Sequence, residues 1–236
     1  MSHDVLGNAL IDYYKQPKDQ TLITFSSVAE KDSMPVSYFF RTFDEMPSLE
    51  QKALELCSGN ILDVGLAAGC HALYLQNKGF KVTGIDISKG ATNVAQQRGV
   101  RHVIKGDVLN TLLDEKFDTV LVLMNGTGIC GKLSNLANFL LKLAELLNSG
   151  GQILIDSSDI IYMYEDENGE HWIDASQAYY GEVAFTMSYQ NQTSETFDWL
   201  YVDYNTLQRC AIYNGLQCEL IQEGEHYDYL AKITKD

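Results

Sequence analysis

A glycine-rich turn that directly follows a short apolar run is the stretch of this sequence best suited to chemistry. Residues 61–80 read ILDVGLAAGCHALYLQNKGF, in which Gly65, Ala67 and Gly69 alternate and Asp63 stands two residues before the first glycine. Glycine has no side chain and adopts backbone conformations that other residues avoid, so a turn of this kind lets a nucleotide lie against the backbone. The sequence therefore predicts a nucleotide-binding loop here.

Ala67 stands where the alternation would place a third glycine. If residue 67 keeps φ below zero, a single methyl group costs little and a nucleotide still fits. If the turn requires a positive φ, alanine would strain it by about 1 kcal/mol or more and push toward the ligand. We expect the negative value.

Other polar residues stand where predicted strands end. The short apolar runs typical of buried parallel strands are NILDVG (60–65), FKVTGID (80–86), VRHVIK (100–105), FDTVLVLM (117–124) and QILID (152–156). Asp86, Asp107, Asn125 and Asp156 come at or just after the last four of these runs. Open parallel sheets bind ligands at the carboxyl ends of their strands, so these side chains are expected to share one edge.

Helical patterns alternate with these strands. One helix follows Gly69 and stops at Gly79, one is capped by Ser88 and ends at Gly99, and one spans about 132–148 before Gly150 and Gly151. Repeated strand–helix–strand steps predict an α/β fold with a mostly parallel sheet and helices on both faces. A helix near 205–214 then precedes QCELIQE and HYDYLAKIT, which a tight turn at Gly224 makes antiparallel.

Two regions interrupt this alternation. Residues 1–59 hold all three prolines, with one helix expected near the start and another near 48–57. Residues 158–204 are rich in aromatic and acidic side chains, and GEVAFTMSYQ there alternates like a strand that pairs with TFDWLYVD. These two regions are expected to form the substrate side of the molecule.

The turn at 63–69, together with VTGIDIS, IKGDVLN, FDTVLVLMNGTG and LLNSGGQILIDSS, resembles class I S-adenosylmethionine (SAM)-dependent methyltransferases, whose first motif reads hydrophobic-D-x-G-x-G-x-G. The resemblance covers roughly residues 58–157 and 205–236. It implies a Rossmann-like sheet of seven strands with a terminal antiparallel hairpin and a β-rich insertion after the fifth strand. It divides the chain into an N-terminal helical lid segment, 1–57, and a methyltransferase domain, 58–236, whose insertion spans about 158–204.

The resemblance also assigns roles to residues. Asp86 would accept hydrogen bonds from both ribose hydroxyls of SAM, and Asp107 would contact the adenine amino group. Asn125 would line the methyl-transfer site. From its own position at the end of the fifth strand, Asp156 is a candidate base if the acceptor is a protonated oxygen or nitrogen. Tyr38 and Arg41 are candidates for substrate binding, and Arg41 could hold a carboxylate of either the cofactor or the substrate. The full set expected to bind the cofactor is Asp63, Gly65, Leu66, Ala67, Gly69, His71, Asp86, Ile87, Asp107, Val108 and Asn125.

Composition limits the partners. A net charge of −15 disfavours nucleic acids, and no apolar run is long enough for a membrane span. The five scattered cysteines suggest reduced thiols in a soluble cytoplasmic protein, and the five histidines have no metal-ligand spacing, so no metal is expected. From residue 143 to residue 208 there is no Lys or Arg among twelve Asp and Glu residues. This is either a solvated acidic face or a field that attracts a neutral or cationic small-molecule acceptor.

Two other interpretations remain, and an oligomer is possible under each. A nicotinamide-dependent oxidoreductase would need a third glycine where Cys70 stands, and its fold lacks the terminal hairpin. A catalytically silent module that binds SAM or its product would keep the same fold, and Ala67 is compatible with that alternative.

Overall fold

The computed structural model describes residues 4–18, 20–29, 31–166, 168–169 and 178–235. Its larger sheet has seven strands in the order β11-β12-β7-β6-β3-β4-β5. The strands are β3 (Asn60–Val64), β4 (Lys81–Asp86), β5 (His102–Lys105), β6 (Phe117–Val122), β7 (Leu147–Ser158), β11 (Leu216–Glu223) and β12 (Asp228–Lys235). Strands β3 to β7 are mutually parallel, whereas β12 runs antiparallel to β7 and β11. The predicted seven-stranded sheet with its terminal hairpin is confirmed.

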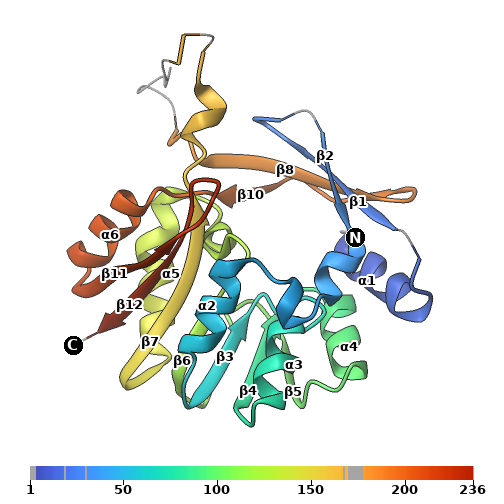
Figure 1. The fold of residues 1–236 in the computed structure, drawn as a ribbon, viewed down its shortest axis with the longest axis horizontal. Helices are drawn as coiled ribbons and strands as arrows, with labels where there is room; N and C mark the ends of the chain where they lie inside the picture. The colour runs from blue at the N-terminus through green and yellow to red at the C-terminus, as the bar shows by residue number, and fades with distance from the viewer. Residues whose placement is uncertain (1–3, 19, 30, 167, 170–177, 236) are drawn as a thin grey trace.

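Helices cover both faces of this sheet (Figure 1). One face packs on α2 (Ser48–Leu56) and α3 (Cys70–Asn77), and the other packs on α5 (Leu133–Glu145) and α6 (Tyr204–Tyr213). Successive side chains of β3 point to opposite faces of the sheet, so the strand contributes to the hydrophobic core on each side. Ile61 is buried on the face covered by α2 and α3, and Leu62 is buried on the face covered by α5 and α6. No helix in the described part of the chain is long and apolar enough to cross a membrane.

Helix α5 ends earlier than the sequence pattern predicts. Its apolar stripe is as expected, with Leu136, Leu140 and Leu143 fully buried against the sheet. The helix stops at Glu145 rather than before the two glycines, because β7 already begins at Leu147, which pairs with Phe117. The glycines therefore lie inside β7.

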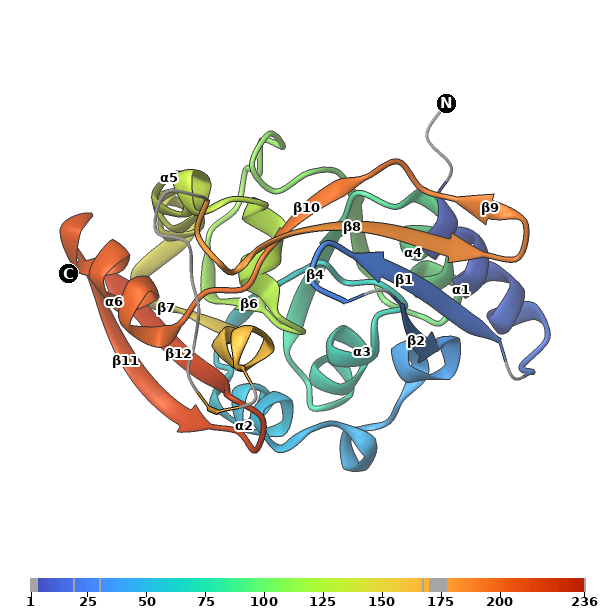
Figure 2. The same ribbon diagram turned by 90° about the horizontal axis from the view of Figure 1, so that it is seen from above.

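A second sheet covers the edge at which β3 to β7 end, which we call the carboxyl edge. This covering sheet has the order β10-β8-β1-β2 and consists of β1 (Thr21–Ser26), β2 (Asp32–Pro35), β8 (Glu182–Tyr189) and β10 (Phe197–Leu200), with β9 (Gln192–Thr193) paired to β8. Figure 2 shows β1, β8 and β10 crossing above the larger sheet. The predicted pairing of β8 with β10 is confirmed. Strands β1 and β2 were not predicted, and they join the N-terminal region to the insertion.

The N-terminal helix α1 (Val5–Lys15) fastens one end of the covering sheet to the body. Asp4 caps α1 by accepting a hydrogen bond from the Gly7 amide, and its other oxygen accepts one from Gly90 in α4 (Lys89–Gln97). The two helices cross so closely that a Cβ at Gly90 would lie 2.4 Å from the Gly7 Cα. Glycine at this crossing is therefore required by the packing.

Candidate active site at the carboxyl edge

The glycine-rich turn after β3 adopts a left-handed backbone at every second residue. The φ angles are +77° at Gly65, +47° at Ala67 and +81° at Gly69, so the expectation of a negative φ at Ala67 is wrong. The amide of Ala67 donates to Asp86 Oδ2 at 2.8 Å, and the Gly65 amide donates to the Ile85 carbonyl at 2.9 Å. These bonds to the end of β4 fix the turn whatever residue stands at position 67. The Ala67 methyl is half-buried and packs against the apolar cluster around α1.

Asp86 lies at the end of β4, where sequence reasoning places the ribose. Its Oδ1 accepts a hydrogen bond from the Ser88 amide at 2.8 Å, so both carboxylate oxygens are held by backbone donors. Burial raises the pKa of Asp86, and these two amides partly oppose that effect. The adjacent Ile87 is 73% exposed and presents an apolar surface at the same edge.

Asp107 follows β5 and organises the next turn. Its Oδ1 accepts from the Leu109 amide at 2.9 Å and its Oδ2 accepts from Asn110 Nδ2 at 2.6 Å, while Val108 between them is buried. The structure thus brings the predicted cofactor residues of β3, β4 and β5 onto three neighbouring strand ends.

A buried ionic network lies beneath the glycine-rich turn. Glu50 of α2 forms an ion pair with Arg41 through its Oε2, and the same oxygen lies 2.6 Å from His71 Nε2 in the first turn of α3. Arg41, Glu50 and His71 are each at most 6% exposed. Asp63, at the end of β3, is also buried and contributes to the electrostatic field at His71.

The network changes the ionisation of its members. Burial opposes the charged form of Glu50, yet His71 and Arg41 together lower its pKa below the ordinary value. Burial likewise opposes a charged His71, but the neighbouring Cys70 thiol first, and then Glu50 and Asp63, raise its pKa well above 6.5. Burial raises the pKa of Asp63. Among the described residues, Arg41 Nε and Asp63 Oδ2 are buried atoms without a hydrogen-bond partner. A buried donor and a buried acceptor therefore lack partners within the protein.

Asp156 lies at the end of β7 and is held by the turn after β6. Its Oδ1 accepts from the Gly126 amide at 3.0 Å and its Oδ2 accepts from the Met124 amide at 3.2 Å. Burial raises its pKa to about 6. Asn125 stands between the two donors in a left-handed conformation, and its Oδ1 accepts from the Ser158 hydroxyl at 2.7 Å. Both residues predicted to be catalytic thus meet at this turn, Asn125 as part of it and Asp156 as the acceptor of its amides.

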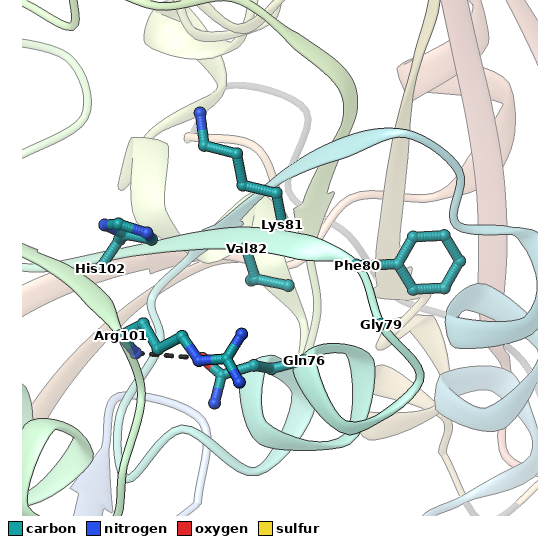
Figure 3. A pocket seen from close by; sticks show the side chains of 7 residues that line it. All are labelled: Gln76, Gly79, Phe80, Lys81, Val82, Arg101 and His102. Carbon is teal, nitrogen blue, oxygen red and sulfur yellow. Dashed lines mark hydrogen bonds between the residues drawn. The ribbon is translucent and has the colours of Figure 1, made fainter.

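The predicted substrate residues border a cavity. The Arg41 guanidinium stacks over the Tyr38 ring at 4.0 Å from the ring centroid. Both residues line a hollow of about 300 Å³ between α1 and the short helices η1 (Val36–Phe40) and η2 (Phe43–Glu45). A second cavity, of about 170 Å³, lies between the end of α3 and the amino-terminal ends of β4 and β5 (Figure 3). Parallel strands begin there, so this second cavity is remote from the carboxyl edge.

The covering sheet contributes residues that sequence reasoning did not assign to the site. Phe185 of β8 and Phe197 of β10 are directly paired and share a face with Trp199. Trp199 contacts the helix η3 (Gly126–Cys130), where a Cβ on Gly128 would lie 1.9 Å from its ring. This inner face therefore turns toward the carboxyl edge. The sequence signal for these residues was the alternation along β10, which places Phe197 and Trp199 on the same face of the strand.

Glu50 was also missed. It follows Leu49 and precedes Ala53 on the buried side of α2, so the signal was an acidic residue at an apolar position of an amphipathic helix.

Comparisons with known proteins agree with this geometry. A family model described as a methyltransferase domain matches residues 62–155. The crystal structure of a SAM-dependent methyltransferase from Bacteroides fragilis, in complex with S-adenosyl-L-homocysteine (SAH), is 44% identical to this chain. It aligns over 98% of this chain and 94% of its own, with a TM-score of 0.92. The chain belongs to the SAM-dependent methyltransferases. The oxidoreductase alternative is thereby excluded, and SAM is the cofactor of this methyltransferase.

More distant structures share the fold alone. The CcbJ methyltransferase from Streptomyces caelestis is 12% identical over 98% of each chain, with a TM-score of 0.63. The sugar N-methyltransferase KedS8 from a Streptoalloteichus species is 16% identical over 79% of this chain and 85% of its own, with a TM-score of 0.56. Among curated proteins no relative matches this methyltransferase. Within the described residues, no group of three or more His, Cys, Asp and Glu side chains is arranged to hold a metal ion.

Proposed function

We propose that this enzyme methylates a small-molecule amine at the carboxyl edge of the larger sheet, beneath the covering sheet, with Asp156 as the general base. The observation that carries the proposal is the position of Asp156. It is a buried carboxylate at a strand end, held by two backbone amides, with a pKa raised by burial to about 6. Such a group is suited to take a proton near neutral pH.

The residues at the carboxyl edge fit SAM. We infer that Asp86 holds the ribose and that Ile87, which is largely exposed, packs on the adenine, with Asp107 near the adenine edge. The methionyl end of SAM carries an ammonium and a carboxylate. Asp63 Oδ2 and Arg41 Nε, the buried acceptor and donor without partners, have matching chemistry. Gly65 is exposed and has no side chain to obstruct the cofactor.

We infer that the remaining predicted cofactor residues stabilise the glycine-rich loop and the neighbouring turns without contacting polar atoms of SAM. Leu66, Gly69 and Val108 are buried, and we infer that they shape the loop rather than contact polar atoms of the ligand. His71 is held by Glu50, which fixes the first turn of α3 beside the loop. Asn125 keeps its backbone in the conformation that directs the flanking amides at Asp156.

When bound, SAM supplies an electrophilic methyl group on a sulfonium sulfur and leaves as SAH. The work of the protein is to position the acceptor, exclude water and receive the proton that the acceptor nitrogen releases. Asp156 receives that proton on a carboxylate oxygen. The inner face of the covering sheet, with Phe185, Phe197 and Trp199, supplies aromatic walls that favour a neutral ring or a cation.

The acidic stretch supports an amine over an anionic acceptor. Residues 143–208 carry no Lys or Arg, and this segment includes Asp156 as well as strands β8 and β10. An ammonium group is therefore attracted to this side of the molecule. Tyr38 and Arg41 line the neighbouring cavity, and we propose that Tyr38 contacts the acceptor while Arg41 faces the cofactor carboxylate.

The deciding experiment titrates the ligand-free protein by calorimetry with SAM, SAH and NAD, and then measures methylation of a panel of small amines, phenols and carboxylic acids. We expect micromolar binding of SAM and SAH, no binding of NAD, and product only with amines. Methylation confined to phenols or acids would contradict the amine assignment. Absence of SAM and SAH binding would contradict the function itself.

A further inference from the structure

Asp4 makes more hydrogen bonds than the cap of a helix requires. Its Oδ1 accepts from the Gly7 amide at 3.0 Å, which is the bond that caps α1. Its Oδ2 accepts from the Gly90 amide of α4 at 2.8 Å. The Ser88 hydroxyl also donates to this carboxylate, with Oγ 2.8 Å from Oδ1 and 3.0 Å from Oδ2. A serine could supply the capping bond alone, so the further bonds serve the contact between α1 and the start of α4.

Ser88 connects Asp4 to the carboxylate at the end of β4. The hydroxyl oxygen of Ser88 accepts from the Ala91 amide at 2.9 Å, which caps α4 and leaves the hydroxyl proton for Asp4. The backbone amide of Ser88 donates to Asp86 Oδ1 at 2.8 Å. Ser88 and Asp86 are each 9% exposed. One buried residue is therefore bonded to Asp4 through its side chain and to Asp86 through its main chain.

Asp86 keeps capacity for further hydrogen bonds on both oxygens. Among the described residues, Oδ1 accepts from the Ser88 amide and Oδ2 accepts from the Ala67 amide, whereas each carboxylate oxygen has two lone pairs. The ribose hydroxyls would use the lone pairs that remain, whose directions depend on how the two amides orient the carboxylate. Burial first, and the negative charge of Asp4 as a further cause, raise the pKa of Asp86, so Asp4 is near enough to act on it electrostatically.

Other residues of the N-terminal segment are connected to the glycine-rich turn. Arg98, which follows α4, donates from Nη1 to the Ala68 carbonyl at 2.6 Å, and its guanidinium lies 4.8 Å from the centroid of the Phe40 ring in η1. The Tyr14 hydroxyl of α1 donates to the Gln97 carbonyl of α4 at 3.1 Å. Helix α1 lies beside α4 in both Figure 1 and Figure 2. The segment that precedes α2 is thus attached to the cofactor turn as well as to α4.

Resting on the proposed placement of the ribose at Asp86, we propose that Asp4 is a positioning residue for SAM that acts through Ser88. Asp4 holds the start of α4 where the Ser88 amide orients the Asp86 carboxylate toward the ribose. Docking of α1 on α4 and binding of the cofactor are then coupled. Because such coupling is reciprocal, bound SAM stabilises the docked α1.

The test measures the affinity for SAH by calorimetry in variants of Asp4 and Ser88. Asp4→Ser keeps a hydroxyl that can cap α1 but is too short to reach Ser88 and Gly90 as well. We expect it to weaken SAH binding by about three- to tenfold, the range for residues that modulate a site without touching its ligand. Ser88→Ala keeps the backbone amide that bonds Asp86 and removes only the hydroxyl. In that background, Asp4→Ser should weaken SAH binding by less than about twofold, because the connection is already absent.

Ala9→Gly is the matched control for a weakened α1. Ala9 is fully buried in the cluster between α1 and α4, and glycine there lowers helix propensity and deletes a buried methyl group. The bonds of Asp4 to Ser88 and Gly90 stay in place. We expect this variant to melt several degrees below wild type and to bind SAH within about twofold of the wild-type affinity.

The remaining outcomes contradict the inference. Equal SAH affinity of wild type and Asp4→Ser would overturn it. A loss of affinity in Ala9→Gly as large as that in Asp4→Ser would also overturn it, since any weakening of α1 would then suffice. An undiminished effect of Asp4→Ser in the Ser88→Ala background would exclude the route through Ser88. Asp86→Ala separates the two levels: unchanged SAH affinity in Asp86→Ala would refute the placement of the ribose and this inference with it. Weaker binding in Asp86→Ala but not in Asp4→Ser would refute this inference alone.

Discussion

Replacing Ala67 with glycine tests whether the left-handed backbone of the cofactor turn carries strain. A left-handed conformation costs a non-glycine residue about 1–2 kcal/mol, and Ala67 has a φ of +47°. Glycine removes that strain but gives the unfolded chain extra freedom, worth about 0.4–1 kcal/mol. It also deletes a half-buried methyl group worth about 0.4 kcal/mol, half of a fully buried one. We expect a free energy of unfolding between about 0.4 kcal/mol lower and about 1.2 kcal/mol higher than that of wild type.

Ala68 provides a matched control next in the chain. It is fully buried and does not share the positive φ of its neighbour. Ala68→Gly therefore deletes a whole buried methyl and adds unfolded freedom without relieving strain, which lowers stability by about 1–2 kcal/mol. For a protein of this size, 1 kcal/mol corresponds to about 2–4 °C in the melting temperature.

The assay is thermal unfolding of wild type, Ala67→Gly and Ala68→Gly, followed by calorimetric titration of each with SAM. We expect the melting temperature of Ala67→Gly to be no more than about 2 °C below that of wild type or to exceed it, with SAM bound equally or more tightly, while Ala68→Gly melts several degrees lower. If Ala67→Gly loses as much stability as Ala68→Gly, the assigned strain is refuted. If Ala67→Gly binds SAM clearly less tightly, the methyl makes a useful contact.

Three further perturbations address the site. Asp86→Ala should weaken SAM binding by about 1.5–3 kcal/mol, the scale of lost hydrogen bonds to a charged group, and an unchanged calorimetric Kd would contradict the ribose assignment. In wild type, kcat/KM should rise as the pH increases through about 6, because Asp156 ionises there and is a base only as the carboxylate. That rise should disappear in Asp156→Asn, and its persistence would exclude Asp156 as the base. Glu50→Ala should lower the free energy of unfolding by about 3–5 kcal/mol, because Arg41 and His71 would lose their shared buried partner. Denaturant titration measures this change, and a loss below about 1 kcal/mol would contradict a stabilising role for the Arg41–Glu50–His71 network.

The larger sheet could be predicted because its signals are local. Each parallel strand is a short apolar run, and glycines with positive φ at positions 79 and 99 end α3 and α4 as expected. Ser88 caps α4 through its side chain, which accepts from the Ala91 amide. The positions of Asp86 and Asp156 at the ends of their strands could be predicted from the same local pattern.

The covering sheet could not be predicted in full because its pairing is not local. Strand β1 pairs with β8, about 160 residues later in the chain, and β2 has all four residues exposed, so it carries no apolar alternation. Edge strands of this kind form only because a neighbour supplies the hydrogen bonds. The role of Glu50 was hidden for a similar reason, since Arg41 and His71 reach it from two other segments.

The carboxyl edge concentrates features that lower stability, and Asp156 with the turn that holds it is the clearest case. A shift of its pKa from 3.8 to about 6 corresponds to about 3 kcal/mol of unfavourable free energy for the ionised form at neutral pH. The turn that holds it is itself strained, because Met124 and Asn125 have φ values of +68° and +56°. That strained backbone directs the Met124 and Gly126 amides at the carboxylate. A neutral side chain with an ordinary turn would be more stable, and the base role that we propose for Asp156 would account for this cost, because a base needs a carboxylate whose pKa is raised toward neutral pH.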